Sequence, residues 1–245
     1  MIARFRLLAL AAALLLTAGA WPPAARAAQF TPAQRAEIVQ IVRQAMQKDP
    51  TILRDAILAL QADRAKHDAK AALAQGAAGL VTPADPVDGN AHGAVTVVEF
   101  FDVRCPYCRA MNPTVDALLK QDPNVRWVFK DLPILGPASM LGSRALLAAQ
   151  KQGGYLKLRA ALMAAPPDIT EATIKTAATK LGLDWARLKR DMDDPAVKAR
   201  LAANLKLAQT LGIDGTPALV IGHQIIPGAV DLAGLEQVVA AQAKG

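Results

Sequence analysis

The sequence is poor in the residues that cross-link chains or bind metals. Its 245 residues include two cysteines and three histidines. Cys105 and Cys108 would close a loop too short to stabilise a fold strongly, which excludes a disulfide-stapled scaffold. The histidines, His67, His92 and His223, lie too far apart for a metal-ligand pattern. We therefore expect no histidine metal centre and no bound cofactor.

Charge of one sign is not clustered along the chain. The formal net charge is +7, and the basic residues are scattered rather than grouped in a block. Proteins that bind nucleic acid usually gather basic side chains on one face, so we expect no nucleic-acid partner. Aromatic residues make up only 4% and hydrophobic residues 53% of the chain, a balance that suits a helical protein rich in alanine and leucine.

An apolar run stands at the start of the chain. Leu7 to Ala20 is almost wholly apolar, follows Arg4 and Arg6, and precedes a small-x-small site at 25–27. This layout predicts a secretory signal peptide over residues 1–27, with an uncleaved membrane anchor as the alternative. The leader carries three arginines and no acid, so the mature chain has a net charge of +4. An exported protein can hold disulfides.

Residues 28–80 are predicted to form a helical arm. Thr31 can cap a first helix that begins with Pro32, and Asp49 with Pro50 can start a second one. Apolar residues recur at helical spacing before the seam turns polar at Arg64; the predicted contact residues are Ile38, Val42, Leu53, Ile57 and Leu60. The arm has too few large apolar residues to fold alone. It must pack on another subunit or on the body of its own chain.

The strongest predicted strand runs from Ala94 to Val103. It is rich in β-branched and aromatic residues on both faces, as in a strand buried between layers. A helix follows over residues 105–121, and a second strand over 124–135. This order predicts a βαβ unit with both cysteines at its first turn. Residues 74–93, rich in glycine, alanine and proline, are expected to be an irregular linker.

Helices alone are predicted over about residues 137–211, where glycine or proline marks most of the breaks. Beyond them, TPALVIG and HQIIPGA indicate two short strands, and DLAGLEQVVAAQAK indicates a final helix. With the helical block set aside, the remaining order of elements is that of a thioredoxin fold. The predicted class is α/β: a thioredoxin fold with an inserted helical domain and an N-terminal helical arm.

The two cysteines are placed for chemistry. Cys105 stands at the predicted N-terminus of a helix, where unpaired backbone N–H groups and the helix dipole favour a thiolate. Cys108 lies one turn further in and should be more buried. The spacing predicts that Cys105 forms a mixed disulfide and that Cys108 resolves it. A local disulfide without a role is the alternative, and the position at a strand-to-helix turn disfavours it.

Three stretches in order, VVEFFDVRCPYC, VFKDLPIL and GIDGTPALVIG, resemble the DsbA-like thiol–disulfide oxidoreductases of the bacterial cell envelope. The resemblance implies a domain over residues 88–245 that exchanges disulfides through the catalytic motif Cys105-Pro106-Tyr107-Cys108. It implies a periplasmic location, exported protein substrates and an envelope redox partner. It also implies a cis bond between Thr216 and Pro217 beside Cys105, with the Thr216 backbone offered to a substrate strand and its hydroxyl within reach of the sulfur.

The arm resembles the N-terminal segment of the ScsC-like branch, which is linked in that family to copper tolerance. There the arm can mediate oligomerisation, and oligomers tend to isomerise disulfides while monomers tend to oxidise them. A homo-oligomer is therefore implied, although the polar turn at Arg64 leaves open an arm packed on its own domain. A Cu(I)-binding protein using Cys105 and Cys108 is the second candidate, because thiolates are soft ligands.

Glu99 lies on the first predicted strand, six residues before Cys105. Members of the family often have an acid there that relays protons beneath the active site, and the resemblance implies this role for Glu99. Lys130 on the neighbouring strand is the expected partner, because pairing offsets the cost of burying either charge. The alternative places both side chains in water at the ends of their strands.

Overall fold

The computed structural model describes residues 30–243, so the predicted signal peptide over 1–27 lies outside the described residues. The chain divides into two compact units, one ending at Ala59 and the other beginning at Leu60. None of the described helices is long and apolar enough to span a membrane.

The first unit contains helix α1 (Pro32–Lys48) and the beginning of helix α2 (Thr51–Leu80). The Thr31 hydroxyl accepts a hydrogen bond from the amide of Gln34, whose side chain accepts one from the Thr31 amide, a reciprocal cap. The Asp49 carboxylate accepts from the Thr51 amide at the start of α2. The predicted break is therefore present. Many large apolar side chains of this unit are exposed, among them Ile38, Val42, Leu53 and Ile57.

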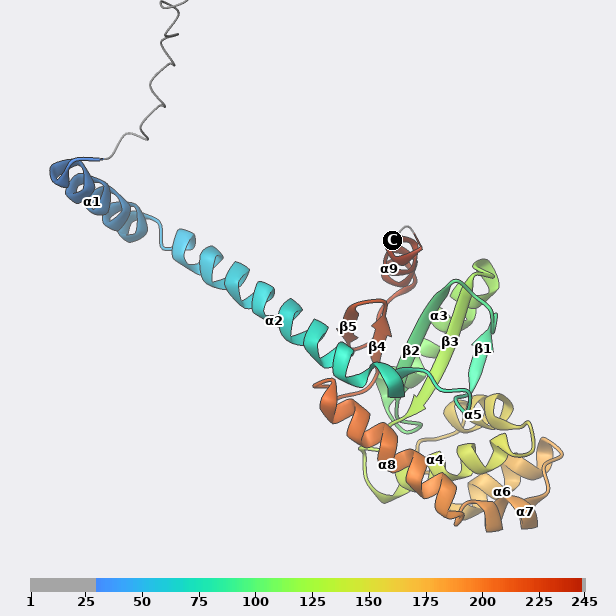
Figure 1. Ribbon diagram of the computed structural model, residues 1–245. Helices are drawn as coiled ribbons and strands as arrows, with labels where there is room; N and C mark the ends of the chain where they lie inside the picture. Colours follow the sequence, from blue (N-terminus) through green and yellow to red (C-terminus); the bar gives the residue numbers. More distant parts are fainter. Residues whose placement is uncertain (1–29, 244–245) are drawn as a thin grey trace, which may run out of the picture. The chain divides into compact units, whose positions relative to one another are not determined.

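The second unit is built around a five-stranded sheet of order β1-β3-β2-β4-β5 (Figure 1). Its strands are β1 (Val87–Gly89), β2 (Val95–Phe101), β3 (Val125–Asp131), β4 (Ala218–Ile221) and β5 (Gln224–Pro227). The pair β2–β3 is parallel and the other neighbours are antiparallel. The α/β class and the predicted βαβ and ββα segments are confirmed.

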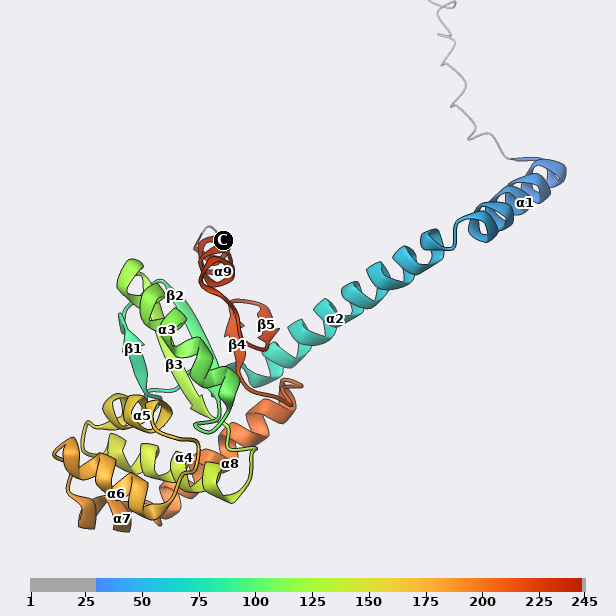
Figure 2. The ribbon, with the colours of Figure 1, turned by 180° about the vertical axis from the view of Figure 1, so that it is seen from behind.

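Helices cover both faces of the sheet, and alternate residues of each strand point to opposite layers. On one face, Phe101 and Trp127 pack with α3 (Pro106–Gln121) and α9 (Leu232–Gln242), and α3 lies in front of the sheet in Figure 2. On the other face, Phe100 and Val128 pack with the end of α2 and with the C-terminal part of α8 (Pro195–Thr210). This parity decides where each charged strand residue points.

The inserted block consists of helices from the end of β3 to the start of β4, as predicted. Before α8 come α4 (Pro137–Gln150), α5 (Tyr155–Ala164), α6 (Glu171–Lys180) and α7 (Trp185–Asp191). Side-chain caps begin α6, α7 and α8, since Thr170, Asp184 and Asp194 accept hydrogen bonds from amides of the first turn.

The expected irregular linker over 74–93 is partly wrong. Helix α2 continues to Leu80, and β1 adds an edge strand that pairs with β3. Gly76 does not break the helix but allows a close approach: a Cβ there would lie 2.9 Å from a methyl carbon of Leu211, just beyond α8. Packing on α8 stabilises this part of α2 against the low helix propensity of glycine.

Candidate active site

The two cysteines lie at the start of α3. Cys105 is the residue that precedes the helix, its side chain makes no capping hydrogen bond, and Pro106 occupies the first turn. Both cysteines are free thiols. Cys105 retains 4% of its surface whereas Cys108 is completely buried. Tyr107, between them, is 67% exposed. The expected order of burial is therefore present.

The loop before β4 lies against this turn. The bond between Thr216 and Pro217 is cis, and the Cys105 thiol donates a hydrogen bond to the backbone oxygen of Thr216 at 3.1 Å. The expected proximity is present, but the sulfur bonds to the main chain of Thr216 and not to its hydroxyl. A groove of about 580 Å³ adjoins the same loop, lined by residues 209–218 and by part of α2 and β5.

Asp102 holds the chain that leads into Cys105, a contact that the sequence analysis missed. Its buried carboxylate accepts hydrogen bonds from the amides of Arg104 at 2.8 Å and of Ile134 and Leu135 at 3.0 Å. Its backbone oxygen accepts from the Cys105 amide at 3.0 Å. The loop after β3 and the cysteine turn are thereby fixed to one carboxylate, which preorganises the thiol.

Two arginines that flank the motif tie it to the insertion, and sequence reasoning missed them as well. Arg104 donates to the backbone oxygens of Leu135 at 2.7 Å and Pro167 at 2.9 Å. Arg109 donates to carbonyls at the end of α5 and just beyond it, those of Leu162, Met163 and Ala165. The sequence RCPYCR, in which each arginine is adjacent to a cysteine, was the signal that could have indicated them.

Glu99 lies beneath the motif, on the face of the sheet that packs against α3. It is completely buried, and its Oε2 accepts a hydrogen bond from the Trp127 indole at 2.9 Å and lies 3.4 Å from Nη2 of Arg159. Burial raises the pKa of Glu99, although the charge of Arg159 and the indole act against it. Burial, and then the charge of Glu99, raise the pKa of Cys108. The carboxylate and the resolving thiol therefore influence each other.

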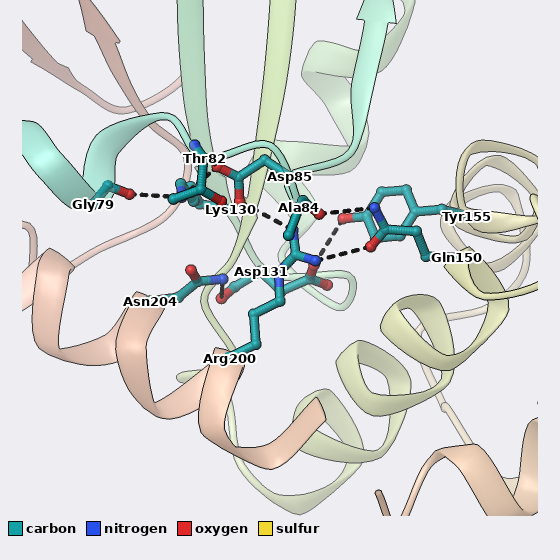
Figure 3. A network of polar contacts seen from close by, with 10 residues as sticks. All are labelled: Gly79, Thr82, Ala84, Asp85, Lys130, Asp131, Gln150, Tyr155, Arg200 and Asn204. Atoms are coloured by element: carbon teal, nitrogen blue, oxygen red, sulfur yellow. Dashed lines mark hydrogen bonds and ion pairs between the residues drawn. The ribbon is translucent and has the colours of Figure 1, made fainter. Parts of the chain in front are cut away.

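The expected pairing of Glu99 with Lys130 is wrong. In the parallel register Lys130 lies opposite Phe100, and Phe129 lies opposite Glu99. Lys130 therefore points to the other face of the sheet, where it pairs with Asp85 at 2.7 Å and donates to the Gly79 oxygen at 2.8 Å (Figure 3). Both Glu99 and Lys130 are buried, so the alternative of two solvated side chains is wrong too.

The Lys130 contacts belong to a wider buried network (Figure 3). Arg200 of α8 donates to the second oxygen of Asp85 at 3.0 Å. Asp131, at the end of β3, accepts a hydrogen bond from the Tyr155 hydroxyl at 2.7 Å, and burial raises the pKa of Asp131 to about 7. These groups join the loop between α2 and β1 to the sheet and to the insertion. None of the hydrogen bonds named here joins them to the cysteines.

Within residues 30–243, no three histidine, cysteine, aspartate or glutamate side chains gather as they would around a metal ion. The chemistry that the site offers is that of its two thiols: one at a helix N-terminus against a loop, and one buried beside a carboxylate.

Comparisons with known proteins agree with this geometry. A thioredoxin-like oxidoreductase from Silicibacter pomeroyi is 43% identical, with a TM-score of 0.65 over 67% of this chain and 95% of that one. A linker-deletion mutant of ScsC from Proteus mirabilis is 32% identical, with a TM-score of 0.67 over 89% of this chain and 99% of that one.

Curated relatives include proteins of two kinds. The thiol:disulfide interchange protein DsbA of Bordetella parapertussis is 29% identical over 70% of this chain and 86% of its own length. The other kind is much longer: this chain spans about a quarter, 24%, of the Na(+)/H(+) antiporter NhaA 3 of Salinispora tropica, at 31% identity.

A family model, that of the DSBA-like thioredoxin domain, matches residues 96–240. The match runs from β2 into α9 and includes both cysteines and the Thr216-Pro217 bond. DsbA-like proteins of this fold are thiol–disulfide oxidoreductases, in keeping with the name of the Bordetella relative. The chain therefore belongs to the family of DSBA-like thioredoxin domains, as the sequence resemblance implied.

Proposed function

We propose that this protein exchanges disulfides with exported proteins in the bacterial cell envelope, with Cys105 as nucleophile and Cys108 as resolving thiol. One observation carries the proposal: the Cys105 sulfur, at the N-terminus of α3, lies 3.1 Å from the Thr216 oxygen, while Cys108 is completely buried one turn further along the helix. A substrate that lies along the Thr216 loop can reach only the first thiol.

The reaction consists of two thiol–disulfide exchanges. The Cys105 thiolate attacks a substrate disulfide, so that a Cys105–substrate bond forms and one substrate thiolate leaves. Cys108, once deprotonated, attacks the Cys105 sulfur, forms the intramolecular disulfide and releases the second substrate thiolate. The substrate gains two electrons that the dithiol loses. In the opposite direction, the same steps oxidise a substrate dithiol and leave the protein reduced.

Glu99 is the proton acceptor for Cys108 in this proposal. Cys108 must lose a proton before it can attack, and burial opposes the thiolate. Glu99 is a completely buried acid whose charge acts on that thiol. Its Oε1 makes no hydrogen bond within the described part of the chain, which leaves an oxygen on which a proton can be held.

The setting is the periplasm, with a redox partner that restores the dithiol or the disulfide after each turnover. The predicted signal peptide over 1–27 supports export. DsbA-like proteins act on protein substrates and depend on redox partners, so both are proposed for this chain.

The arm is proposed to join copies of the chain and so to favour isomerisation over oxidation. The support is an unusual density of exposed apolar side chains between Phe30 and Leu60, from 40% to 58% exposed. Apolar surface of this extent is commonly covered by a partner, and a second copy offers an identical helical seam. The match to the ScsC structure covers 89% of this chain, more than residues 60–245 alone would supply.

Cysteine variants test the proposal. Cys105→Ala should abolish reduction of insulin, and Cys108→Ala should trap mixed disulfides with protein substrates, seen as bands on non-reducing gels that disappear on reduction. Asp116→Asn, at an exposed position on the same helix, serves as a control that keeps both thiols. Full exchange activity in both cysteine variants would refute the assignment.

A further inference from the structure

Arg159 reaches from the insertion to the underside of the active site. It lies on α5, is 7% exposed, and places Nη2 3.4 Å from Oε2 of Glu99 and 3.0 Å from Oδ1 of Asn112 on α3. Within the described residues it is the only basic side chain that forms an ion pair with Glu99. The counter-charge of the buried acid therefore comes from the inserted block and not from the sheet.

Two aromatic rings fix the guanidinium in place. Its central carbon lies 4.0 Å from the ring centroid of Phe129 and 4.6 Å from that of Phe101. Such contacts attract a cation, most strongly where water is excluded. Arginine keeps its charge at every pH at which a protein is folded. Glu99 thus faces a constant positive charge in a medium where charges interact strongly.

Several other groups share this region. Trp127 donates to Glu99 from β3, and the charge of Glu99 raises the pKa of Cys108 on α3. The charge of Arg159 also acts on Asp131 and on Tyr155. For Glu99, burial raises the pKa and Arg159 is the largest influence that lowers it. Removal of the guanidinium would leave burial opposed only by the indole.

We propose that Arg159 is a positioning residue that keeps Glu99 ionised and thereby sets the rate at which Cys108 resolves the mixed disulfide. The inference rests on the exchange reaction proposed above. It gives the inserted block a direct part in the chemistry: the acid belongs to the sheet and its counter-charge to α5.

Resolution consists of a proton transfer followed by a thiol–disulfide exchange. The Cys108 S–H bond breaks and its proton passes to the Glu99 carboxylate. The Cys108 thiolate then attacks the Cys105 sulfur, the bond from Cys105 to the substrate breaks, and the substrate sulfur leaves with the electron pair. Glu99 afterwards returns the proton to solvent or to the leaving sulfur. A Glu99 that is already protonated cannot accept the proton, so the step slows.

The test uses the reduced mature protein and the aromatic disulfide 5,5′-dithiobis(2-nitrobenzoic acid), followed by absorbance from pH 5 to 9. The first thiolate released reports attack by Cys105, and the second reports resolution by Cys108. We expect Arg159→Met to leave the first phase in place and to slow the second about tenfold at pH 7. The midpoint of its pH profile should rise by about one unit, the lower end of the shifts that a neighbouring opposite charge produces. Arg159→Lys, which keeps the charge, should restore most of the rate.

Three controls separate chemistry from folding. Glu99→Gln should slow the second phase as much as Arg159→Met, and the double variant should be no slower than Glu99→Gln alone. Asp131→Asn removes the other acid near Arg159 and should leave the midpoint where it is. A uniform slowing with an unmoved midpoint, or a Glu99→Gln protein with a normal second phase, would overturn the inference. If the wild-type protein released no thiolate in either phase, the exchange reaction itself would be refuted.

Discussion

The Cys105 thiol donates a hydrogen bond to the backbone oxygen of Thr216, 111 positions later in the chain. A thiolate has no proton to donate, so ionisation of Cys105 ends this bond and leaves the carbonyl with an unused lone pair. The activated state of the nucleophile and an acceptor for a substrate N–H are thus produced together. An extended peptide laid along this loop would meet both.

Tyr107, the exposed residue between the cysteines, offers a test of how oxidising the pair is. A neutral phenol supplies no positive charge to the Cys105 thiolate, whereas a protonated histidine would stabilise the reduced form. We expect Tyr107→His to raise the reduction potential by about 30 mV, equal to about 1.4 kcal/mol for a two-electron couple. Equilibration with glutathione buffers measures it, with Tyr107→Phe as the uncharged control. An unchanged potential in the histidine variant would contradict this account.

The arm can be tested in the mature full-length protein. Ile38→Glu with Val42→Glu introduces two charges on one face of α1, on side chains that are 41% and 46% exposed. If copies of the chain meet along this face, burial of the new carboxylates is costly and the complex should dissociate. Light scattering should then change from an oligomer to a monomer mass.

Gln40→Glu adds one carboxylate on the opposite face of α1 and should keep the oligomer. Equal monomer masses for all three proteins would refute self-association and would favour an oxidase over an isomerase. A truncated chain should begin at Leu60, where the second unit begins, so that it keeps Leu73, which packs in the core with Leu207.

The cysteine motif could be predicted because its signal is local: a β-branched strand, a turn and a helix in one stretch. The partner of Glu99 could not be predicted, because it depends on contacts between distant segments. Glu99 and Lys130 stand on adjacent parallel strands, and a register in which Phe129 lies opposite Glu99 sends them to opposite faces. Sequence does not specify that register. Arg159 comes from a helix 60 positions away, and only the packing of the insertion brings it to Glu99.

The helix at the start of the predicted linker could not be predicted for a related reason. Gly76 and Gly79 reduce helix propensity locally, but the helix packs closely there: a Cβ at Gly76 would lie 2.9 Å from a methyl carbon of Leu211, and one at Gly79 would lie 3.6 Å from Leu207. Tertiary contact therefore outweighed propensity. The inserted helices could be predicted, because their caps and breaks depend on neighbouring residues in the sequence.

Lys130 should be structural and not catalytic. Lys130→Met removes a buried cation from Asp85, which keeps Arg200 at 3.0 Å. We expect a loss of about 3 kcal/mol in unfolding free energy, the lower end for a broken buried pair, because one partner remains. Exchange activity per folded molecule should persist, which insulin reduction well below the melting temperature would show. If exchange slowed as much as in Glu99→Gln, Lys130 would have to act on the cysteines after all.

Asp131 should make the fold less stable as the pH rises. Its pKa is about 7 in the folded protein, against an ordinary value of 3.8, because the carboxyl is buried. Between these values the folded state holds a proton that the unfolded state has lost, so the free energy of unfolding falls with increasing pH, by at most about 1.4 kcal/mol per unit from this group.

Asp131→Asn abolishes the titration and can still accept a hydrogen bond from the Tyr155 hydroxyl. Urea unfolding at pH 5 and pH 8 should therefore show Asp131→Asn gaining stability relative to wild type at the higher pH. Asp116→Asn, at an exposed position on α3, should change neither value, and an equal difference at both pH values for Asp131→Asn would refute the raised pKa.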